Sequence, residues 1–173
     1  ILIINQKIYI SYINNDNECY SNAIAEGNLN TKKINFSSFF KLDECKNRFN
    51  LSVGGNITKF KNNKILLTVG DYASYEDGKL LGVAPEEYDP QNKDSYYGKI
   101  LSIDLTTKDI DIVSMGHRNP QGLFYASNED LIFSTEHGPQ GGDEINVNIN
   151  PNSNSINNYG WAISSYGEHY GAS

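Results

Sequence analysis

Two short stretches of this chain gather residues that could do chemistry: Gly116-His-Arg-Asn-Pro-Gln-Gly-Leu123 and Glu136-His-Gly-Pro-Gln-Gly-Gly-Asp-Glu144. The permanently charged guanidinium of Arg118 can donate in a fork to an anion, and Asn119 and Gln121 can donate or accept beside it. Turns rich in glycine, proline and oxygen atoms suit a hard cation. The pattern therefore predicts a polar ligand site beside a hard-cation site, both at the ends of strands.

The elements that must position these residues are predicted to be strands. Short runs alternate apolar or β-branched residues with polar ones and end in polar turns, as half-buried strands do. No convincing long helix is predicted, and segments 71–97 and 149–158 read as loops. The predicted strands are Lys7–Ser11, Ser21–Ala25, Asn56–Phe60, Lys64–Thr68, Gly98–Ile103, Gln121–Tyr125, Asp130–Ser134 and Asp143–Asn148.

These strands repeat in three units of about residues 1–49, 50–114 and 115–173, each built on a similar core strand. The repeat predicts an all-β fold of the β-propeller type, and an ordinary β-sandwich is the alternative. A propeller needs about four to eight blades, so three units would leave sheet faces and edges exposed. We therefore expect either a longer native protein or copies that assemble to complete the ring.

Composition narrows the classes of partner. The net charge of −7 and the scattered basic residues disfavour nucleic acid and anionic membranes. No apolar run reaches the roughly 18 residues that a membrane-spanning helix needs. The two cysteines, Cys19 and Cys45, allow either a disulfide in an exported protein or two thiols.

Several motifs in consistent order carry a resemblance to a known family. They are the two stretches above, with the second extending to Asn146, together with Asn158-Tyr-Gly-Trp161, residues 55–71 ending in Gly-Asp, and Ser95-Tyr-Tyr-Gly-Lys-Ile-Leu-Ser-Ile-Asp104. Over most of residues 50–162 the chain resembles the soluble PQQ-dependent glucose/sorbosone (aldose sugar) dehydrogenases. That family implies a six-bladed propeller, of which this chain corresponds to about three blades.

The resemblance also implies an activity. Such enzymes bind pyrroloquinoline quinone (PQQ) with Ca²⁺ and oxidise the C1 hydroxyl of an aldose to a lactone, and an external acceptor takes the electrons. They usually work in the periplasm or outside the cell.

Site roles follow from the resemblance, residue by residue. Arg118 would contact cofactor and substrate, and Asn119 would contact the cofactor. The backbone carbonyls of Gly138 and Pro139 would bind the cofactor's calcium. The residues alone also allow a salt bridge for Arg118, an Asx turn at Asn119 and a plain turn at Gly138.

Other positions have different expected roles. Glu144 and the backbone of Tyr159 would bind a second calcium. His117 is expected to be scaffold or rim, and His137 to pack rather than act as a base.

The sequence departs from the family at Ser52, which stands where the family's catalytic histidine is expected, with Asp71 as the partner that orients this base. A serine hydroxyl has no resting pKa suited to accepting a proton near neutral pH. Two alternatives to an active dehydrogenase therefore stay open. One is a non-catalytic propeller that binds a sugar or a protein, and the other is a structural half-propeller completed by another chain.

Overall fold

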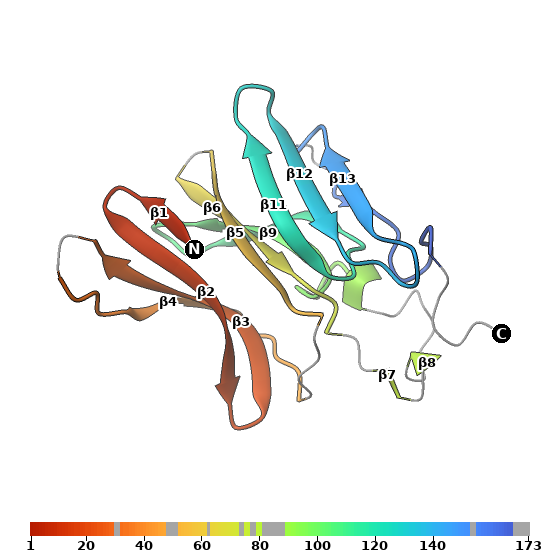
Figure 1. The fold of residues 1–173 in the computed structure, drawn as a ribbon, viewed down its shortest axis with the longest axis horizontal. Coiled ribbons are helices and arrows are strands. Elements are labelled where there is room, and N and C mark those ends of the chain that lie inside the picture. The colour runs from red at the N-terminus through yellow and green to blue at the C-terminus, as the bar shows by residue number, and fades with distance from the viewer. Residues whose placement is uncertain are drawn as a thin grey trace.

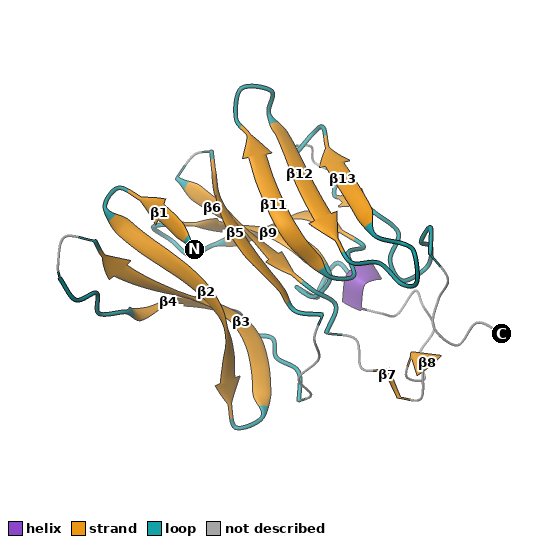
Figure 2. Cartoon of the chain, viewed as in Figure 1, coloured by secondary structure: helices purple, strands orange, loops and turns teal. Residues whose placement is uncertain are grey.

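The structure is a computed structural model that describes residues 1–29, 32–47, 52–61, 63–72, 75–76, 79–80, 89–152 and 155–167. In these ranges every regular element is a strand except one short 3₁₀ turn, η2 (Asp89–Gln91) (Figure 2). The predicted all-β class is therefore confirmed. The middle of the predicted loop 71–97 falls at positions 81–88, outside the described residues. No helix in the described part of the chain is long and apolar enough to cross a membrane.

Three twisted sheets lie side by side, and a two-stranded ribbon stands apart from them (Figure 1). The first sheet has the order β1 (Leu2–Ile4), β2 (Lys7–Asp16), β3 (Cys19–Asn28), β4 (Ser37–Lys41). The middle sheet has the order β14 (Asn157–Asn158), β10 (Ile110–Met115), β9 (Lys99–Asp104), β6 (Lys64–Val69), β5 (Gly54–Phe60). The third sheet has the order β11 (Pro120–Ala126), β12 (Leu131–Glu136), β13 (Glu144–Asn148), and the ribbon pairs β7 (Tyr75–Glu76) with β8 (Lys79–Leu80).

All eight predicted strands are present in the structure. The prediction missed β4 and β10 and the short strands β1, β7, β8 and β14. The sequence of β4, Ser-Ser-Phe-Phe-Lys, does not alternate, because its two buried phenylalanines are adjacent. The three units 1–49, 50–114 and 115–173 stay a prediction, and β14 pairs in parallel with β10 of the middle sheet.

The core lies between the sheets, in two layers on opposite faces of the middle sheet. One layer joins the first and middle sheets and includes Ile24, Leu67 and Leu101. The other layer joins the middle and third sheets and includes Leu66 and Ile132. Strands β6 and β9 are consequently buried on both faces. The middle sheet therefore fixes the position of everything attached to its strand ends.

The outer faces of the first and third sheets stay exposed. Ile3 is 59% exposed on the first sheet, and Phe124 and Ile145 are 61% and 75% exposed on the third. In the third sheet, Phe124 pairs with Phe133, which pairs with Val147, so these residues share one face. The described residues thus carry an apolar surface at each end of the row of sheets.

The structure pairs the two cysteines whose state the sequence left open. Cys19 at the start of β3 and Cys45 in the segment after β4 form a disulfide with 5.3 Å between their Cα atoms. A cross-link over 26 residues contributes about 3 kcal/mol by restricting the unfolded chain.

Candidate functional site

Residues far apart in the sequence meet at one end of the middle and third sheets. The backbone N–H of Asp71 donates to the carbonyl of Arg118 over 2.8 Å. The N–H of Gly54 donates to Oδ1 of Asn119 over 3.1 Å, and the N–H of Trp161 donates to the carbonyl of Gly116 over 3.1 Å. The segments that carry the predicted site residues are thus tied together by their own backbone and amide groups.

Gly116 makes this convergence possible. Its φ of +75° lies in the left-handed region, and a Cβ there would come within 2.2 Å of Oδ1 of Asn158 and 2.6 Å of the backbone nitrogen of Gly160. Only glycine allows both this backbone conformation and so close an approach. The loop before Trp161 can therefore lie directly against the start of the Gly116–Leu123 stretch.

Asp71 and Arg118 are joined through Trp161. The indole Nε1 donates to Oδ2 of Asp71 over 2.7 Å, and the Arg118 Cζ lies 5.7 Å from the centre of the indole ring. Asp71 and Trp161 are both almost fully buried, at 5% and 4% exposure, while Arg118 is half-buried. A cation over an aromatic face and a charge-assisted hydrogen bond therefore place a guanidinium and a carboxylate around one ring.

The Glu136 carboxylate contacts the backbone of Arg118 and two neighbouring side chains. Its Oε2 accepts the backbone N–H of Arg118 over 2.7 Å, and its Oε1 accepts Nδ2 of Asn146 over 2.6 Å. Oε1 also lies 2.9 Å from Nδ1 of His117, whose Nε2 is 2.8 Å from Oγ of Ser114. His117 was predicted to be scaffold or rim, and because it is completely buried it does not lie at the rim.

A backbone carbonyl also holds the guanidinium of Arg118, because Nη1 of Arg118 donates to the carbonyl of His137 over 2.9 Å. Asn119 reaches across the sheets to Gly54 through its side-chain oxygen, a contact that neither sequence-based interpretation of Asn119 included. His137 has a side chain that is 59% exposed and lies 3.6 Å from a carboxylate oxygen of Asp143. The imidazole is exposed, so the packed position predicted for His137 is not observed.

Ser52 lies on the side of the site away from Glu136, and its backbone is held by hydrogen bonds. It is 5% exposed, and its carbonyl accepts the N–H of Tyr72 over 3.1 Å. The Tyr72 hydroxyl donates over 2.9 Å to Asn22 of the neighbouring sheet, and the Asn22 amide donates to the carbonyl of Val53 over 3.1 Å. The backbone position predicted for the base is therefore well defined, but it carries a hydroxyl.

The Gly138–Gly142 segment is a tight turn. The Gly142 N–H donates to the carbonyl of Pro139 over 2.8 Å, and the Gly138 N–H donates to a carboxylate oxygen of Asp143 over 3.1 Å. A Cβ on Gly138 would come within 1.8 Å of the Gly142 carbonyl oxygen. The turn alone accounts for the glycine and proline, and carbonyl ligation of calcium stays a prediction. The described residues contain no group of three or more His, Cys, Asp or Glu side chains that could hold a metal ion.

A cavity of about 670 Å³ brings Asp143, Glu144 and Tyr159 together. Burial raises the pKa of the Glu144 carboxyl and also the pKa of the Tyr159 phenol. A partly desolvated carboxylate favours either a proton or a cation. The two residues predicted to share a second calcium therefore line the same cavity.

Sequence reasoning missed the contacts that organise the site. Trp161 was recognised only as part of a motif, although its indole joins Asp71 to Arg118. Gln91 in the predicted loop bonds both Asn158 and the carbonyl of Trp161. The Asn158-Tyr-Gly-Trp161 motif was the available signal for Trp161, whereas an isolated glutamine in a loop offered none.

Comparison with known proteins supplies the class. A family described as Glucose / Sorbosone dehydrogenase matches residues 4–173. The chain belongs to this family, which confirms the resemblance in its motifs.

Individual relatives agree with this assignment. The chain is 42% identical over 60 residues to the aldose sugar dehydrogenase YliI of Escherichia coli, covering 35% of this chain and 15% of that protein. It is 32% identical over 116 residues to the quinoprotein glucose dehydrogenase B of Acinetobacter calcoaceticus, covering 57% and 23% of the two chains. The solved apo-form of the soluble aldose sugar dehydrogenase of Escherichia coli superposes with a TM-score of 0.69 at 23% identity, covering 96% of this chain and 48% of that one. The chain thus has the β-propeller fold and spans about half the length of that structure.

Proposed function

We propose that this chain forms the cofactor-facing half of a PQQ-dependent sugar dehydrogenase, which oxidises the C1 hydroxyl of an aldose to a lactone. The observation that carries the proposal is the meeting of Asp71, Arg118 and Trp161 at the ends of strands from two sheets. A family match supplies the reaction class, and two quinoprotein or aldose dehydrogenase relatives support it.

The side chains present suit an anionic quinone on the Arg118 side. The guanidinium is oriented by Trp161 and by the His137 carbonyl, so it can donate to a carboxylate without first finding its own conformation. Asn119 lies beside it, tied to Gly54 through its oxygen. When bound, PQQ would supply the electron sink for the two electrons of the alcohol, and an external acceptor would then remove them.

Calcium binding is the second part of the proposal. The carbonyls of Gly138 and Pro139 would hold the cofactor's Ca²⁺, and Glu144 and the Tyr159 backbone would hold a second ion at the cavity that they line. The raised pKa of Glu144 supports the second site, because a bound cation would relieve the cost of burying its carboxylate.

Binding without oxidation is the second candidate, and Ser52 favours it. Proton removal from the C1 hydroxyl requires a base with a pKa near the working pH, and the position predicted for that base is Ser52. With Asp71 already bonded to Trp161, this half of the site would bind a sugar or a protein without assisting its oxidation.

The setting of the protein is proposed from the disulfide and the family. A disulfide with an exposed Cys45 persists in the periplasm or outside the cell, where calcium is also abundant. The apolar outer faces of the first and third sheets would be covered by further blades of a longer chain or by a second copy.

The test is reconstitution with PQQ and Ca²⁺. Cofactor binding is followed by the absorbance of the quinone, and turnover by reduction of a dye acceptor with a panel of aldoses. We expect Arg118→Ala to weaken PQQ binding, with Arg118→Lys intermediate because lysine keeps the charge but loses the fork.

The outcomes separate the candidates. Binding with turnover supports the dehydrogenase, binding without turnover supports the second candidate, and no PQQ binding would overturn the cofactor assignment. Chelation of calcium should lower the melting temperature if either ion binds only the folded chain.

A further inference from the structure

The segment 89–99, here called the strap, lies between the disulfide and the candidate site. It begins with η2 and runs into the first residue of β9. We propose that the strap positions Trp161 against Asp71 and Arg118, that Gln91 is the positioning residue at its near end, and that the Cys19–Cys45 disulfide anchors its far end. Reduction of this disulfide would then loosen the site without dismantling the sheets.

The far end of the strap is docked on the disulfide-linked segment. Backbone hydrogen bonds in both directions pair Tyr20, next to Cys19, with Lys46, next to Cys45. The carboxylate of Glu44 accepts the Ser95 hydroxyl over 2.8 Å and the N–H of Tyr96 over 2.7 Å. The short segment that the disulfide ties to β3 therefore supplies the acceptors for the strap.

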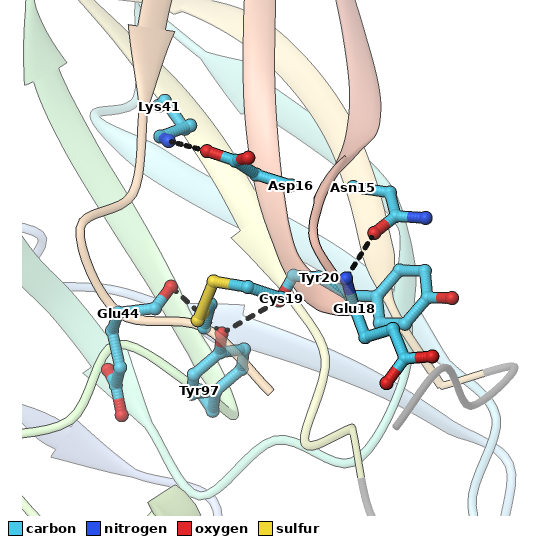
Figure 3. Close-up of a disulfide and its surroundings, with 9 residues drawn as sticks. Asn15, Asp16, Glu18, Cys19, Tyr20, Lys41, Glu44 and Tyr97 are labelled. Atoms are coloured by element: carbon cyan, nitrogen blue, oxygen red, sulfur yellow. Dashed lines mark hydrogen bonds and ion pairs between the residues drawn. A yellow bond between two sulfur atoms is a disulfide. The ribbon is translucent and has the colours of Figure 1, made fainter. Parts of the chain in front are cut away.

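Two further contacts strengthen this docking. The Tyr97 hydroxyl donates to the carbonyl of Glu44 over 3.0 Å, and Figure 3 shows Glu44 and Tyr97 beside the disulfide. Lys46 forms an ion pair with Asp89 and lies 4.7 Å above the Tyr97 ring. Glu44 and Lys46 flank Cys45 in the sequence, so without the disulfide the Tyr20–Lys46 backbone pair would be left to tie both anchors to β3.

The near end of the strap bonds the site. The carbonyl of Pro90 accepts the N–H of Gly116 over 3.0 Å. The amide of Gln91 donates to the carbonyl of Trp161, and the Gln91 and Asn158 amides exchange hydrogen bonds of 2.7 Å and 3.2 Å. Gln91 therefore holds the backbone of Trp161, whose indole holds Asp71 and faces Arg118.

The disulfide is open to reagents. Cys45 is exposed and Cys19 is half-buried, so a thiol can reach the bond from solvent. A dithiol reductant would break the sulfur–sulfur bond by transferring two electrons and two protons. The two cysteines become thiols and the reductant becomes a disulfide.

Trp161 is the only tryptophan in the chain, so its fluorescence reports directly on the site. The experiment reduces the full chain with dithiothreitol and records the emission of Trp161, its quenching by acrylamide and the far-ultraviolet circular dichroism. We expect a shift of the emission to longer wavelength and quenching stronger on the order of twofold, with the sheet signal retained. The fluorescence measurement does not depend on turnover. Failure of this proposal can therefore be distinguished from failure of the proposed function.

Variants make the test specific. The double variant Cys19→Ser/Cys45→Ser should show the shifted emission from the start and should not respond to the reductant. With the disulfide intact, Gln91→Ala should shift the emission in the same way, whereas Gln140→Ala, an exposed glutamine outside the strap, should not.

Two results would overturn the proposal. One is an unchanged emission after thiol titration has shown two free cysteines per chain. The other is loss of the sheet signal on reduction, because the disulfide would then support the whole fold and the strap would have no separate role.

Discussion

The two sides of the candidate site are held equally well but differ in chemistry. On the Arg118 side, the buried Glu136 carboxylate accepts the backbone N–H of Arg118, and the Trp161 indole faces the guanidinium. On the Ser52 side, backbone and amide hydrogen bonds fix the chain with similar precision, yet the position carries only a hydroxyl. The difference teaches that the scaffold of a site and its reactive group are separate properties of the sequence. The scaffold here survives without the base.

The largest expected effect comes from Ser52→His, which supplies a general base on the Ser52 side of the site. A positioned general base contributes ~10²–10⁴-fold to rate, so this variant should raise dye-linked sugar oxidation by that order in the presence of PQQ and Ca²⁺. The rate should fall at low pH as the imidazole is protonated. Ser52→Asn is the control, because it has similar bulk and does not titrate. Equal rates for the two variants would show that more than the base is missing.

The second-largest expected effect concerns the buried Glu136 carboxylate on the Arg118 side of the site. Glu136→Ala leaves the Arg118 N–H and the buried His117 ring without their shared acceptor. We expect the free energy of unfolding to fall by about 3 kcal/mol, measured by urea denaturation. Glu129→Ala, at an exposed turn position, serves as the control and should change it little. A Glu136→Ala protein as stable as this control would mean that the network contributes nothing to stability.

These contrasts also show what the sequence could predict. Alternation suits the strands of the outer sheets, which are apolar on one face, whereas β6 and β9 of the doubly covered middle sheet could be located because they are short apolar runs bounded by polar turns. The motif order identified the family and the residues at the strand ends. The links among Gln91, Trp161 and Asp71 could not be predicted, because they join residues up to 90 positions apart through contacts that leave no periodic pattern.

The smallest expected effect concerns Lys99, which lies on β9 between the strands that lead to the two sides of the candidate site. It pairs in register with Val69, which leads to Asp71, and with Met115, which leads to Arg118. Burial lowers the pKa of Lys99 to about 8 from 10.5, although the nearby carboxylates of Asp89 and Glu44 act in the opposite direction. Between pH 8 and pH 10.5, Lys99 binds more protons in the unfolded chain than in the folded chain. The contribution of Lys99 to the free energy of unfolding therefore rises with pH in this range.

The expected gain is about 2 kcal/mol between pH 8 and pH 10, measured as the free energy of unfolding. Burial also raises the pKa of the Tyr72 and Tyr97 phenols, so their contribution is lost as the pH rises beyond 10. Lys99→Met keeps the apolar stem without the charge and should flatten the rise below pH 10. An equally steep rise in Lys99→Met would assign it to other groups.

The doubly covered middle sheet has a further consequence for exchange of backbone hydrogens with solvent. Amides of β6 and β9 open only with the whole core, so they should be the last to take up deuterium, whereas β13 lies at the edge of a sheet with one bare face. Asp71 follows β6, and Arg118 precedes the strands that lead to β13. The candidate site therefore straddles a boundary between strands expected to exchange slowly and strands expected to exchange rapidly.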